Sequence, residues 1–333
     1  MATNIFNFMN QNFILTPGYI TGLVQTDGSF SCIISTSPEG KVVFIPNLTI
    51  TTDLDSKFVL DAIQSFWDCG KINVDVKDNT ANLVVSSRKE FIEKIFPHFD
   101  KYPLFCAKLH SYNLLKIIIE YLINNKHKTE EGKKEIAIMA LSMNTATQTR
   151  KLDRIKTIRS TLDISDNIPL IPNTINSITT PITNDNISGI IDGDGSFWVS
   201  FQKNGLIQTG FSITADNASL PLLKDIQNQF KNIGSIQYKT TTFSVYFIRS
   251  LKDIINILIP FVDANPLFSE RANHYKIFKE VSIILSKEKP LTLETKLKIV
   301  ELAYNANKNG KRRRLTKSDY IKLLYDNNTG TAL

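Results

Sequence analysis

Polar and apolar side chains alternate in residues 29–35 and again in residues 196–202. In the first stretch Phe30, Cys32 and Ile34 would share one face of a strand, and serines would occupy most of the other face. A period of two is typical of a β-strand with one buried and one exposed face. The pattern therefore predicts sheets that are apolar on one side and polar on the other.

The same kind of pattern extends over two long stretches of the chain, each with the element order αββαββα. A short helix would precede each alternating strand, and helices would close each stretch, so the fold class is α+β. Closing helices are expected at 88–96 and 105–124 in the first stretch. For the first and second stretch in turn, we expect a strand at 42–51 and 206–215, a helix at 55–66 and 219–231, and a hairpin at 71–86 and 235–248.

The short helix that opens each stretch has recognisable ends. Thr16 before Pro17 predicts a helix start, because threonine caps helix N-termini and proline suits the first turn. In the second stretch Asn184 or Asp185 is the expected cap. Both helices would end at an Asp-Gly pair, and glycine commonly terminates a helix.

Five segments recur in the same order, which indicates two homologous halves. We predict an N-terminal half-domain at 1–154, a linker rich in Pro, Ser, Thr and Asn at 155–184, and a C-terminal half-domain at 185–333. The matching pairs are ITGLVQTDGSF (20–30) with ISGIIDGDGSF (187–197), LTITTD (48–53) with FSITAD (211–216), VLDAIQSF (59–66) with LLKDIQNQF (222–230), GKI (70–72) with GSI (234–236), and YPLFCAK (102–108) with NPLFSER (265–271).

Composition limits the class of protein and the kind of metal site. Hydrophobic residues make up 42% of the 333, enough for a sizeable core, and the net charge of +7 favours a polyanionic partner. Cys32, Cys69 and Cys106 form no close pair and the four histidines are scattered, so neither a disulfide framework nor a zinc site is expected. Any metal would be a hard cation on oxygen ligands. No apolar run reaches the length of a membrane span, so no membrane partner is expected.

Small residues in the two short helices would let the helix backbones approach closely. Such packing would bring Asp27 and Asp194 side by side at the helix ends. Two adjacent carboxylates repel each other unless a cation lies between them; Mg²⁺ is the natural occupant, and Ca²⁺ or Mn²⁺ can take the same site. A site of this kind can activate water and stabilise a leaving 3′ oxygen. The small residues at the expected helix interface are Thr21, Gly22, Ser188 and Gly189.

The nonapeptides ITGLVQTDG and ISGIIDGDG resemble the two copies of the LAGLIDADG signature. The repeat, the PLF segments and the stretch at 124–144 are also similar to the single-chain homing endonucleases that fungal mitochondrial introns encode. The resemblance implies two pseudo-symmetric half-domains that form a saddle of antiparallel β-ribbons over DNA, with the LAGLIDADG helices at the interface. It also implies a monomer, a mitochondrial location, and metal-dependent hydrolysis of phosphodiester bonds in double-stranded DNA, cutting both strands across the minor groove.

The resemblance assigns further residues to the site beside the two acids. The backbone carbonyls of Thr26 and Gly193 would be additional metal ligands, and Lys108 and Arg271 would be catalytic cations near the metals. A cation there is chemically sound, because a phosphate under attack gains negative charge. The alternative is that both basic residues are solvated cations at the start of a helix.

Two positions depart from the family pattern. Gln25 stands where the second motif has Asp192; since this position is generally not a metal ligand, activity would survive, but the halves would not be equivalent. Thr52 and Ala215 match a position that often holds a polar side chain that organises water, and Ala215 cannot do this.

The polar face of each sheet is the candidate for reading DNA, because a two-stranded ribbon fits the major groove. Lys and Arg would mostly bind phosphate, and Asn, Gln, Ser and Thr would read base edges; the alternative is an ordinary solvated strand face. Ile33, Val43 and Ile45 fall on the same face, either to contact thymine methyl groups or because the register is shifted by one. The candidates are Ser31, Ser35, Ser37, Lys41, Asn47, Thr49, Lys71, Asn73, Asp75 and Lys77 in the first half, and Trp198, Ser200, Gln202, Lys203, Gln208, Ser212, Gln237 and Lys239 in the second.

We therefore expect a site-specific endonuclease that acts in intron homing. Because the two halves differ, its target would be asymmetric, and two joined ribbons would span about two helical turns, roughly 20 bp. The alternatives are a maturase that binds its own intron RNA and a catalytically silent DNA-binding protein on the same fold. Both acids are present, which favours the nuclease. The basic cluster at 311–314 fits a surface run, an import signal or a DNA contact.

Overall fold

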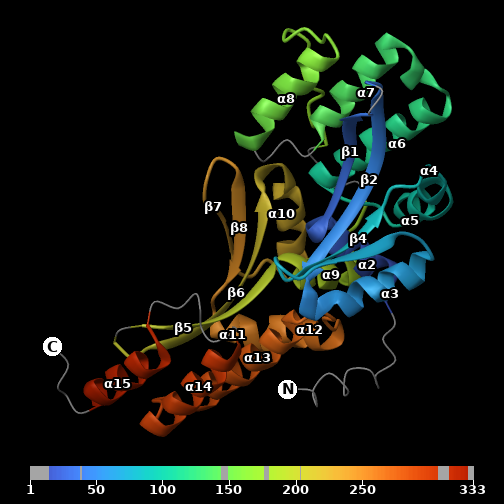
Figure 1. Ribbon diagram of the computed structural model, residues 1–333. Coiled ribbons are helices and arrows are strands. Elements are labelled where there is room, and N and C mark those ends of the chain that lie inside the picture. Colours follow the sequence, from blue (N-terminus) through green and yellow to red (C-terminus); the bar gives the residue numbers. More distant parts are fainter. Residues whose placement is uncertain are drawn as a thin grey trace. The chain divides into compact units, whose positions relative to one another are not determined.

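Two four-stranded antiparallel sheets, each with its own helices, carry the fold (Figure 1). The computed structural model of the chain groups into two compact units, Met1–Ile190 and Ile191–Leu333. The strand order is β1-β2-β4-β3 in the first unit and β5-β6-β8-β7 in the second, so the α+β class and the αββαββα order are confirmed. The structure describes residues 15–37, 40–143, 149–175, 180–202, 204–306 and 315–328.

The strands and helices of the first unit follow the predicted ranges closely. Its strands are β1 (Gly28–Thr36), β2 (Val42–Asp53), β3 (Lys71–Asp75) and β4 (Thr80–Val85). Its helices are α2 (Pro17–Asp27), α3 (Lys57–Trp67), α4 (Arg88–Glu90), α5 (Phe96–Lys101), α6 (Cys106–Ile123), α7 (Glu130–Ser142) and α8 (Thr149–Thr161). A π-helical stretch, Phe91–Ile95, joins α4 to α5.

The second unit repeats the arrangement. Helix α9 (Asn184–Asp194) begins in the first unit and ends in the second. The strands are β5 (Gly195–Phe201), β6 (Ile207–Asp216), β7 (Ser235–Tyr238) and β8 (Phe243–Ile248). The helices are α10 (Leu220–Gln229), α11 (Leu251–Asp253), α12 (Ile259–Ala264), α13 (Arg271–Lys287), α14 (Leu293–Ala306) and α15 (Lys317–Asn328).

Helix α2 starts as predicted, and helix α9 uses a different cap. The Thr16 hydroxyl accepts a hydrogen bond from the Tyr19 amide at 3.2 Å. In α9 the cap is Thr183: its hydroxyl accepts from the Asn186 amide at 3.2 Å, and the Asn186 side chain accepts from the Thr183 amide at 3.0 Å. The prediction of Asn184 or Asp185 was therefore wrong, because this reciprocal pair satisfies two backbone donors at once.

Both LAGLIDADG helices pass directly into a strand at a glycine. Gly28 has extended backbone angles, φ −83° and ψ 149°, rather than the left-handed conformation common after helices. A Cβ there would lie 2.5 Å from the Val24 carbonyl oxygen, and one on Gly195 would overlap the Ile191 carbonyl in the same way. Glycine is thus required by close approach of the backbone, and each acid stands at the junction of a helix and a strand.

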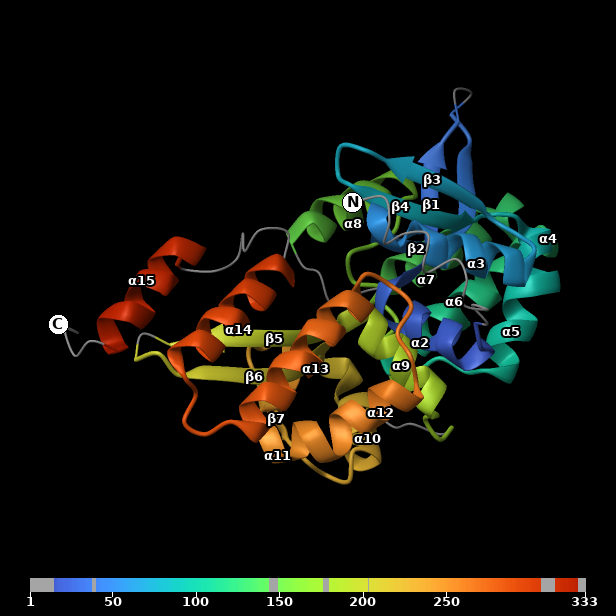
Figure 2. The ribbon, with the colours of Figure 1, turned by 90° about the horizontal axis from the view of Figure 1, so that it is seen from below.

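The apolar face of each sheet packs against helices through aromatic side chains. Phe30 meets Phe99 and Tyr112 edge to face, with ring centroids 5.6 and 5.5 Å apart. In the second unit Phe197 lies 5.0 Å from Phe211 and 5.2 Å from Tyr275 of α13. Figure 2 shows α13 running along β5 and β6. The apolar face of each sheet is thus covered by helices of its own unit.

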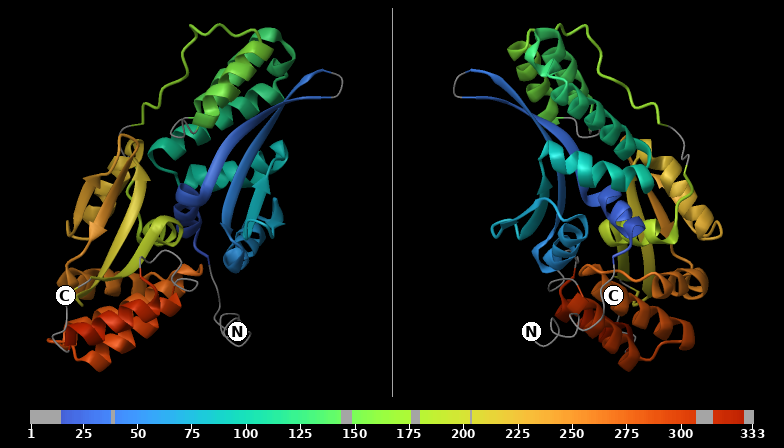
Figure 3. Two further views of the ribbon diagram at one scale, coloured as in Figure 1. Left: turned by 60° about the vertical axis from the view of Figure 1, so that its left-hand side comes forward. Right: turned by 90° about the vertical axis from the view of Figure 1, so that its right-hand side faces the viewer.

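The predicted linker begins inside a helix. Residues 155–161 belong to α8, where Ile158 is buried with Leu162 and Ile164 against α7. Arg159 then fixes the following turn, because its guanidinium donates to the Ser165 and Ile168 carbonyls at 2.5 and 2.6 Å. The chain continues as the extended segment after α8 in Figure 3. Within the described ranges, no helix is both long and apolar enough to span a membrane.

Candidate functional site

Helix α2 packs against the part of α9 that belongs to the first unit, and glycines make the contact. A Cβ on Gly22 would overlap the Asn186 carbonyl and lie 3.0 Å from the Gly189 Cα. A Cβ on Gly189 would in turn overlap the Tyr19 carbonyl. The Asn186 side-chain Nδ2 also donates to the Gly18 carbonyl at 3.0 Å. The two backbones therefore touch at a position where no larger residue fits.

The other two small residues expected at this interface are buried as well, but Thr21 has a different role. Its hydroxyl donates to the Tyr102 carbonyl at 2.9 Å and lies 3.3 Å from His98 Nε2. Thr21 thus fixes the turn that precedes α6, while its neighbour Gly22 faces α9. Ser188 is 4% exposed.

The two candidate acids are the last residues of their helices. Asp27 is half-buried at the end of α2, and Asp194 is exposed at the end of α9. The C-terminal end of a helix carries partial negative charge, which adds to that of the carboxylate and favours a bound cation. Among the residues that the structure describes, no three His, Cys, Asp or Glu side chains come together as a metal site.

A basic residue binds the backbone next to each acid. Lys108 Nζ donates to the carbonyl of Gly28, and Arg271 Nη1 donates to the carbonyl of Gly195. Arg271 also donates to the Asp192 carbonyl at 2.9 Å and to the Gly193 carbonyl at 2.5 Å. Each cation is thus tied to the glycine that follows the acid of its own half. One of the carbonyls that Arg271 binds, that of Gly193, is the one that the family resemblance assigns to metal.

Gln25 and Asp192 hold the turns that carry these cations, a role that sequence reasoning missed. Gln25 Oε1 accepts from the Phe105 amide at 2.9 Å, and its Nε2 donates to the Phe105 carbonyl at 3.3 Å. Asp192 Oδ2 accepts from the Phe268 and Ser269 amides at 2.6 and 2.9 Å, and Oδ1 accepts from the Ser269 hydroxyl. Gln25 and Asp192 therefore fix equivalent turns, although Gln25 both accepts and donates and Asp192 uses its carboxylate only to accept. The sequence feature that could have indicated this role is the PLF segment, which occurs once in each half and contains or adjoins the residues that Gln25 and Asp192 bind.

Positions 52 and 215 differ as the sequence indicated. The Thr52 hydroxyl is buried and has no hydrogen-bond partner among the described residues. A buried polar group of this kind is usually satisfied by water or a ligand. Ala215, which pairs with Ser244 across β6 and β8, has no polar side-chain atom. The two halves are thus not chemically equivalent at this position.

The strand register fixes which residues share the polar face of the first sheet. Ser31 pairs with Asn47, Ile33 with Ile45, and Ser35 with Val43. Ile33 is 42% exposed and Val43 37%, so these aliphatic side chains do lie on the polar face. The alternative of a register shifted by one residue was wrong.

Several candidates on this face use their polar atoms within the unit. Asn47 is 8% exposed; it donates to the Thr49 hydroxyl at 2.8 Å and accepts from the Ser86 hydroxyl at 3.2 Å. The Asp75 carboxylate accepts from the amides of Lys77 and Asp78 at 2.9 and 3.2 Å, and so holds its own turn. The side chains of Ser35, Lys41, Lys71, Asn73 and Lys77 are exposed.

The polar face of the second sheet is differently built. Trp198 pairs with Gly210 and its ring covers the glycine, since a Cβ on Gly210 would overlap the indole. Ser200 pairs with Gln208, whose Oε1 accepts from the Gln202 amide at 3.1 Å. Lys203 and the cluster at 311–314 lie outside the described residues.

Two residues on this face were missed by sequence reasoning. Phe247 pairs with Ser212 in β6 and with Ser235 in β7, which places it on the polar face. The guanidinium of Arg249 lies 4.6 Å from the Phe247 ring centre, and Lys239 Nζ lies 4.9 Å from it. The signal was the alternation in β8, where a large apolar residue occupies an outward position.

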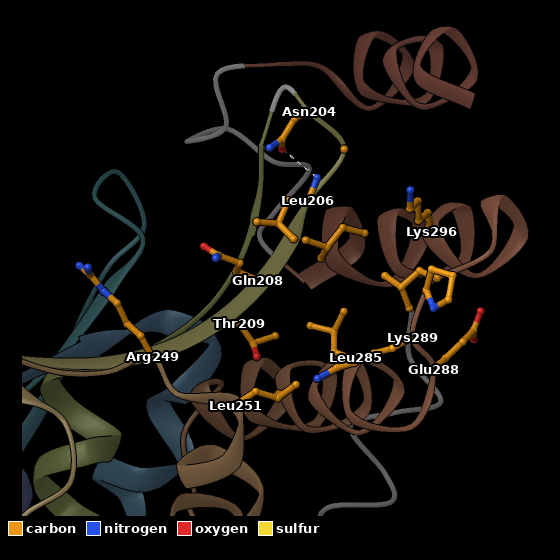
Figure 4. Close-up of a pocket in the computed structure, with 14 residues that line it drawn as sticks. Asn204, Leu206, Gln208, Thr209, Arg249, Leu251, Leu285, Glu288, Lys289 and Lys296 are labelled. Carbon is orange, nitrogen blue, oxygen red and sulfur yellow. Dashed lines mark hydrogen bonds between the residues drawn. The ribbon is translucent and has the colours of Figure 1, made fainter. Parts of the chain in front are cut away.

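A cavity of about 600 Å³ lies beside the start of β6 and is closed by the ends of α13 and α14 (Figure 4). Arg249, Lys289 and Lys296 line it together with Glu288. The Glu288 carboxylate accepts from the Thr292 amide and the Thr295 hydroxyl, each at 2.9 Å. On the helical side of the cavity, Lys289 and Lys296 therefore outnumber Glu288 among the charged side chains.

These features agree with what comparison with known proteins shows. A family model described as LAGLIDADG endonuclease matches residues 20–119 and 187–282. The chain therefore belongs to the LAGLIDADG endonuclease family. Both matched segments begin in a helix that ends at one of the two acids, so the repeat inferred from the sequence is confirmed.

Named relatives come from fungi. The chain is 29% identical over 301 residues to "Probable intron-encoded endonuclease 2" of Neurospora crassa, which covers 86% of this chain and 64% of that protein. It is 27% identical over 269 residues to "Probable intron-encoded DNA endonuclease 1" of Mycosarcoma maydis, which covers 78% of this chain and 94% of that protein. The chain thus spans just under two thirds of the length of the Neurospora protein.

Solved structures share the fold. The homing endonuclease I-GzeII in complex with its DNA target has a TM-score of 0.78 at 23% identity, covering 90% of this chain and 100% of that one. I-LtrWI bound to target DNA has a TM-score of 0.77 at 24% identity, covering 88% and 98%. I-SmaMI bound to uncleaved DNA in the presence of calcium ions has a TM-score of 0.77 at 22% identity, covering 89% and 100%.

Proposed function

We propose that the chain is a site-specific endonuclease that hydrolyses both strands of double-stranded DNA at a long asymmetric target, and that it acts in intron homing. The observation that carries the proposal is the repeated arrangement at the helix ends. In each half a carboxylate ends the motif helix, and a basic side chain binds the carbonyl of the next glycine. Membership of the endonuclease family and the names of the fungal relatives support the same activity.

Asp27 and Asp194 would hold hard divalent cations, with Mg²⁺ as the metal used. The donors present fit such an ion, since each acid offers carboxylate oxygens and is preceded by a residue whose backbone carbonyl is an oxygen ligand rather than a nitrogen or sulfur one. When bound, the ion supplies an activated water and stabilises charge on the leaving oxygen. The calcium ions in the I-SmaMI complex with DNA support a divalent cation for the family fold. Thr26 and Gly193 are the proposed carbonyl ligands.

Lys108 and Arg271 would stabilise the negative charge that builds on the phosphate during attack. Lys108 donates to the Gly28 carbonyl, and its flexible chain can move from there to a phosphate oxygen. Arg271 is fixed by three carbonyls and would act mainly as a positioned charge. Gln25 and Asp192 are positioning residues, because they fix the turns from which the two cations extend.

The polar sheet faces would read the DNA. Exposed side chains at Ser35, Asn73 and Gln208 can reach base edges, and those at Lys41 and Lys71 can bind phosphates. Different side chains on the two faces would give an asymmetric target of roughly 20 bp, read by a monomer. We place the protein in the mitochondrion, because its relatives are intron-encoded and one is the product of an ND4 intron in Podospora anserina.

The test is cleavage of a duplex that spans the insertion site of the intron carrying this reading frame. With Mg²⁺ we expect a double-strand break that EDTA abolishes and that Asp27→Asn and Asp194→Asn both lose while still binding the duplex. Asp166→Asn is the matched control, since Asp166 is exposed in a loop of the first unit. Binding without cutting by the unaltered protein would instead indicate a silent DNA-binding protein, and stimulation of RNA splicing alone would indicate a maturase.

A further inference from the structure

Two cations flank one aromatic ring on the polar face of the second sheet. The Arg249 guanidinium lies 4.6 Å from the centre of the Phe247 ring, and Lys239 Nζ lies 4.9 Å from it. Lys239 is further held by a 2.8 Å hydrogen bond to Gln237 Oε1. A cation over an aromatic face is attracted by the ring, so both side chains are held in place before any ligand arrives. We refer to Lys239, Phe247 and Arg249 as the cation platform.

The charges of the cation platform are available to a ligand. Neither Arg249 nor Lys239 forms an ion pair with a carboxylate in the part of the chain that the structure describes. Their neighbours on the same face are uncharged, because Phe247 is paired with Ser212 on one side and Ser235 on the other. In Figure 4 the Arg249 guanidinium points away from the helices that close the cavity. The platform thus presents an ordered guanidinium outward.

The first half has no counterpart of the platform. Alignment of the repeated strands puts Val84 at the place of Phe247, Ser86 at that of Arg249, and Asp75 at that of Lys239. The Ser86 hydroxyl is bonded to Asn47, and the Asp75 carboxylate holds its own turn. The cation platform therefore belongs to the second half alone. We expect it to contact a feature that is present in only one of the two half-sites.

We propose that Arg249 is a specificity-determining residue that reads a guanine in the half-site contacted by the second sheet. Guanine offers two acceptors, N7 and O6, side by side in the major groove, and the arginine fork binds both at once. Phe247 holds the guanidinium in the orientation needed, and Lys239 adds a second cation beside the electron-rich base edge. A stacked arginine loses little freedom when it forms this pair. The inference rests on the proposed function, since it requires that the sheet faces DNA.

The experiment uses the full-length protein, Ca²⁺, and a duplex spanning the intron insertion site in which each guanine of the second half-site is replaced in turn by 7-deazaguanine. Loss of N7 at one position should weaken binding by about tenfold. Arg249→Gln should weaken binding to the natural duplex by a similar factor and should be insensitive to 7-deazaguanine at that position. Arg249→Lys should bind at an intermediate level and discriminate poorly. Lys224→Gln is the matched control, because Lys224 is an exposed cation on α10.

The outcomes separate two failures. If the unaltered protein does not bind the duplex, the proposed function fails. If it binds, but Arg249→Gln weakens all sequences equally and lowers the salt dependence by about one counterion, Arg249 contacts a phosphate and the inference is overturned. The inference is also overturned if Arg249→Gln loses as much affinity as the unaltered protein does on every 7-deazaguanine duplex. Circular dichroism of each variant checks that its secondary structure is unchanged.

Discussion

Gly22 and Gly189 each lie directly against the backbone of the other's helix. A Cβ on Gly22 would overlap the Asn186 carbonyl, and a Cβ on Gly189 would overlap the Tyr19 carbonyl. Backbone atoms cannot move aside as the end of a flexible side chain can. The two glycines therefore set the distance between α2 and the part of α9 that belongs to the first unit.

Replacing either glycine should be severely destabilising. We expect Gly22→Ala and Gly189→Ala to lower the free energy of unfolding by about 3 kcal/mol, at the upper end for overpacking, because the added methyl group meets carbonyl oxygens. Urea unfolding followed by circular dichroism measures this loss. Gly40→Ala is the control: a Cβ at Gly40 meets nothing within 4 Å, although its φ of +78° adds a backbone cost of about 1 kcal/mol. Equal losses at positions 22 and 40 would argue against helix contact as the cause.

Asp192 and Gln25 should matter for catalysis through position rather than through contact with the DNA. Asp192→Ala removes the oxygens that accept from the Phe268 and Ser269 amides and from the Ser269 hydroxyl, so these donors lose their partner. We expect a loss of about 1–3 kcal/mol in stability and a lower cleavage rate with nearly unchanged DNA affinity. Single-turnover cleavage and binding measured on one duplex separate the two effects.

Gln25→Glu is the informative partner of that variant. Glutamate can still accept from the Phe105 amide, but it cannot donate to the Phe105 carbonyl as Gln25 Nε2 does. The cleavage rate should fall, and Gln25→Ala should reduce it further. A change in affinity without a change in rate would mean that position 25 acts on the DNA surface instead.

The sequence predicted the fold from short patterns whose meaning is local. Alternation in 29–35 and 196–202 indicated strands with the correct inner face, and Thr16 with Pro17 indicated the start of α2. The repeat gave the order αββαββα because the same local signals occur twice. These features depend on neighbours within a few residues, so one sequence is enough to find them.

The remaining features depend on contacts between distant residues. The sequence does not show that Gln25 binds Phe105, because the two residues are 80 positions apart and only folding brings them together. It also does not show that residues 155–161 belong to α8, since the burial of Ile158 depends on α7 rather than on composition. Phe247 was not among the predicted surface residues, because its place on the outer face follows from its register with Ser212.

His98 should make the first unit sensitive to acid. Its ring is 7% exposed among Trp67 and Phe99, with centroids 5.3 and 4.7 Å away, and burial lowers its pKa from 6.5 to about 4. Between pH 6.5 and 4 the unfolded chain binds a proton that the folded chain does not. Stability is therefore complete above pH 6.5 and falls as the pH drops, by roughly 3 kcal/mol at pH 4.

The check is urea unfolding at pH 7 and at pH 4.5 for the unaltered protein and for His98→Gln. Glutamine cannot titrate, so the variant should be less stable at pH 7 but should lose less stability between the two pH values. His127→Gln is the comparison, since its side chain is only half-buried and also has a pKa lowered by burial. A pH dependence identical in all three proteins would show that carboxylates, not His98, govern the acid response.

Substitutions of Lys108 and Arg271 should separate effects on the cleavage rate from effects on stability, because the two side chains bind different sets of backbone carbonyls. Arg271 donates to the carbonyls of Asp192, Gly193 and Gly195, so Arg271→Ala leaves the end of α9 without these bonds. We expect it to cost about 1.5–3 kcal/mol of stability and to slow cleavage.

Lys108→Ala removes the bond to the Gly28 carbonyl and should cost less stability than Arg271→Ala. Its cleavage rate should still fall by about 100-fold, the usual cost of removing one charge-stabilising donor. A supercoiled plasmid carrying the target shows nicking and linearisation separately. If the two cations serve different strands, each alanine variant should accumulate nicked plasmid, and the double variant should do neither reaction. Equal loss of both cuts in each single variant would mean that the two cations act on one shared step.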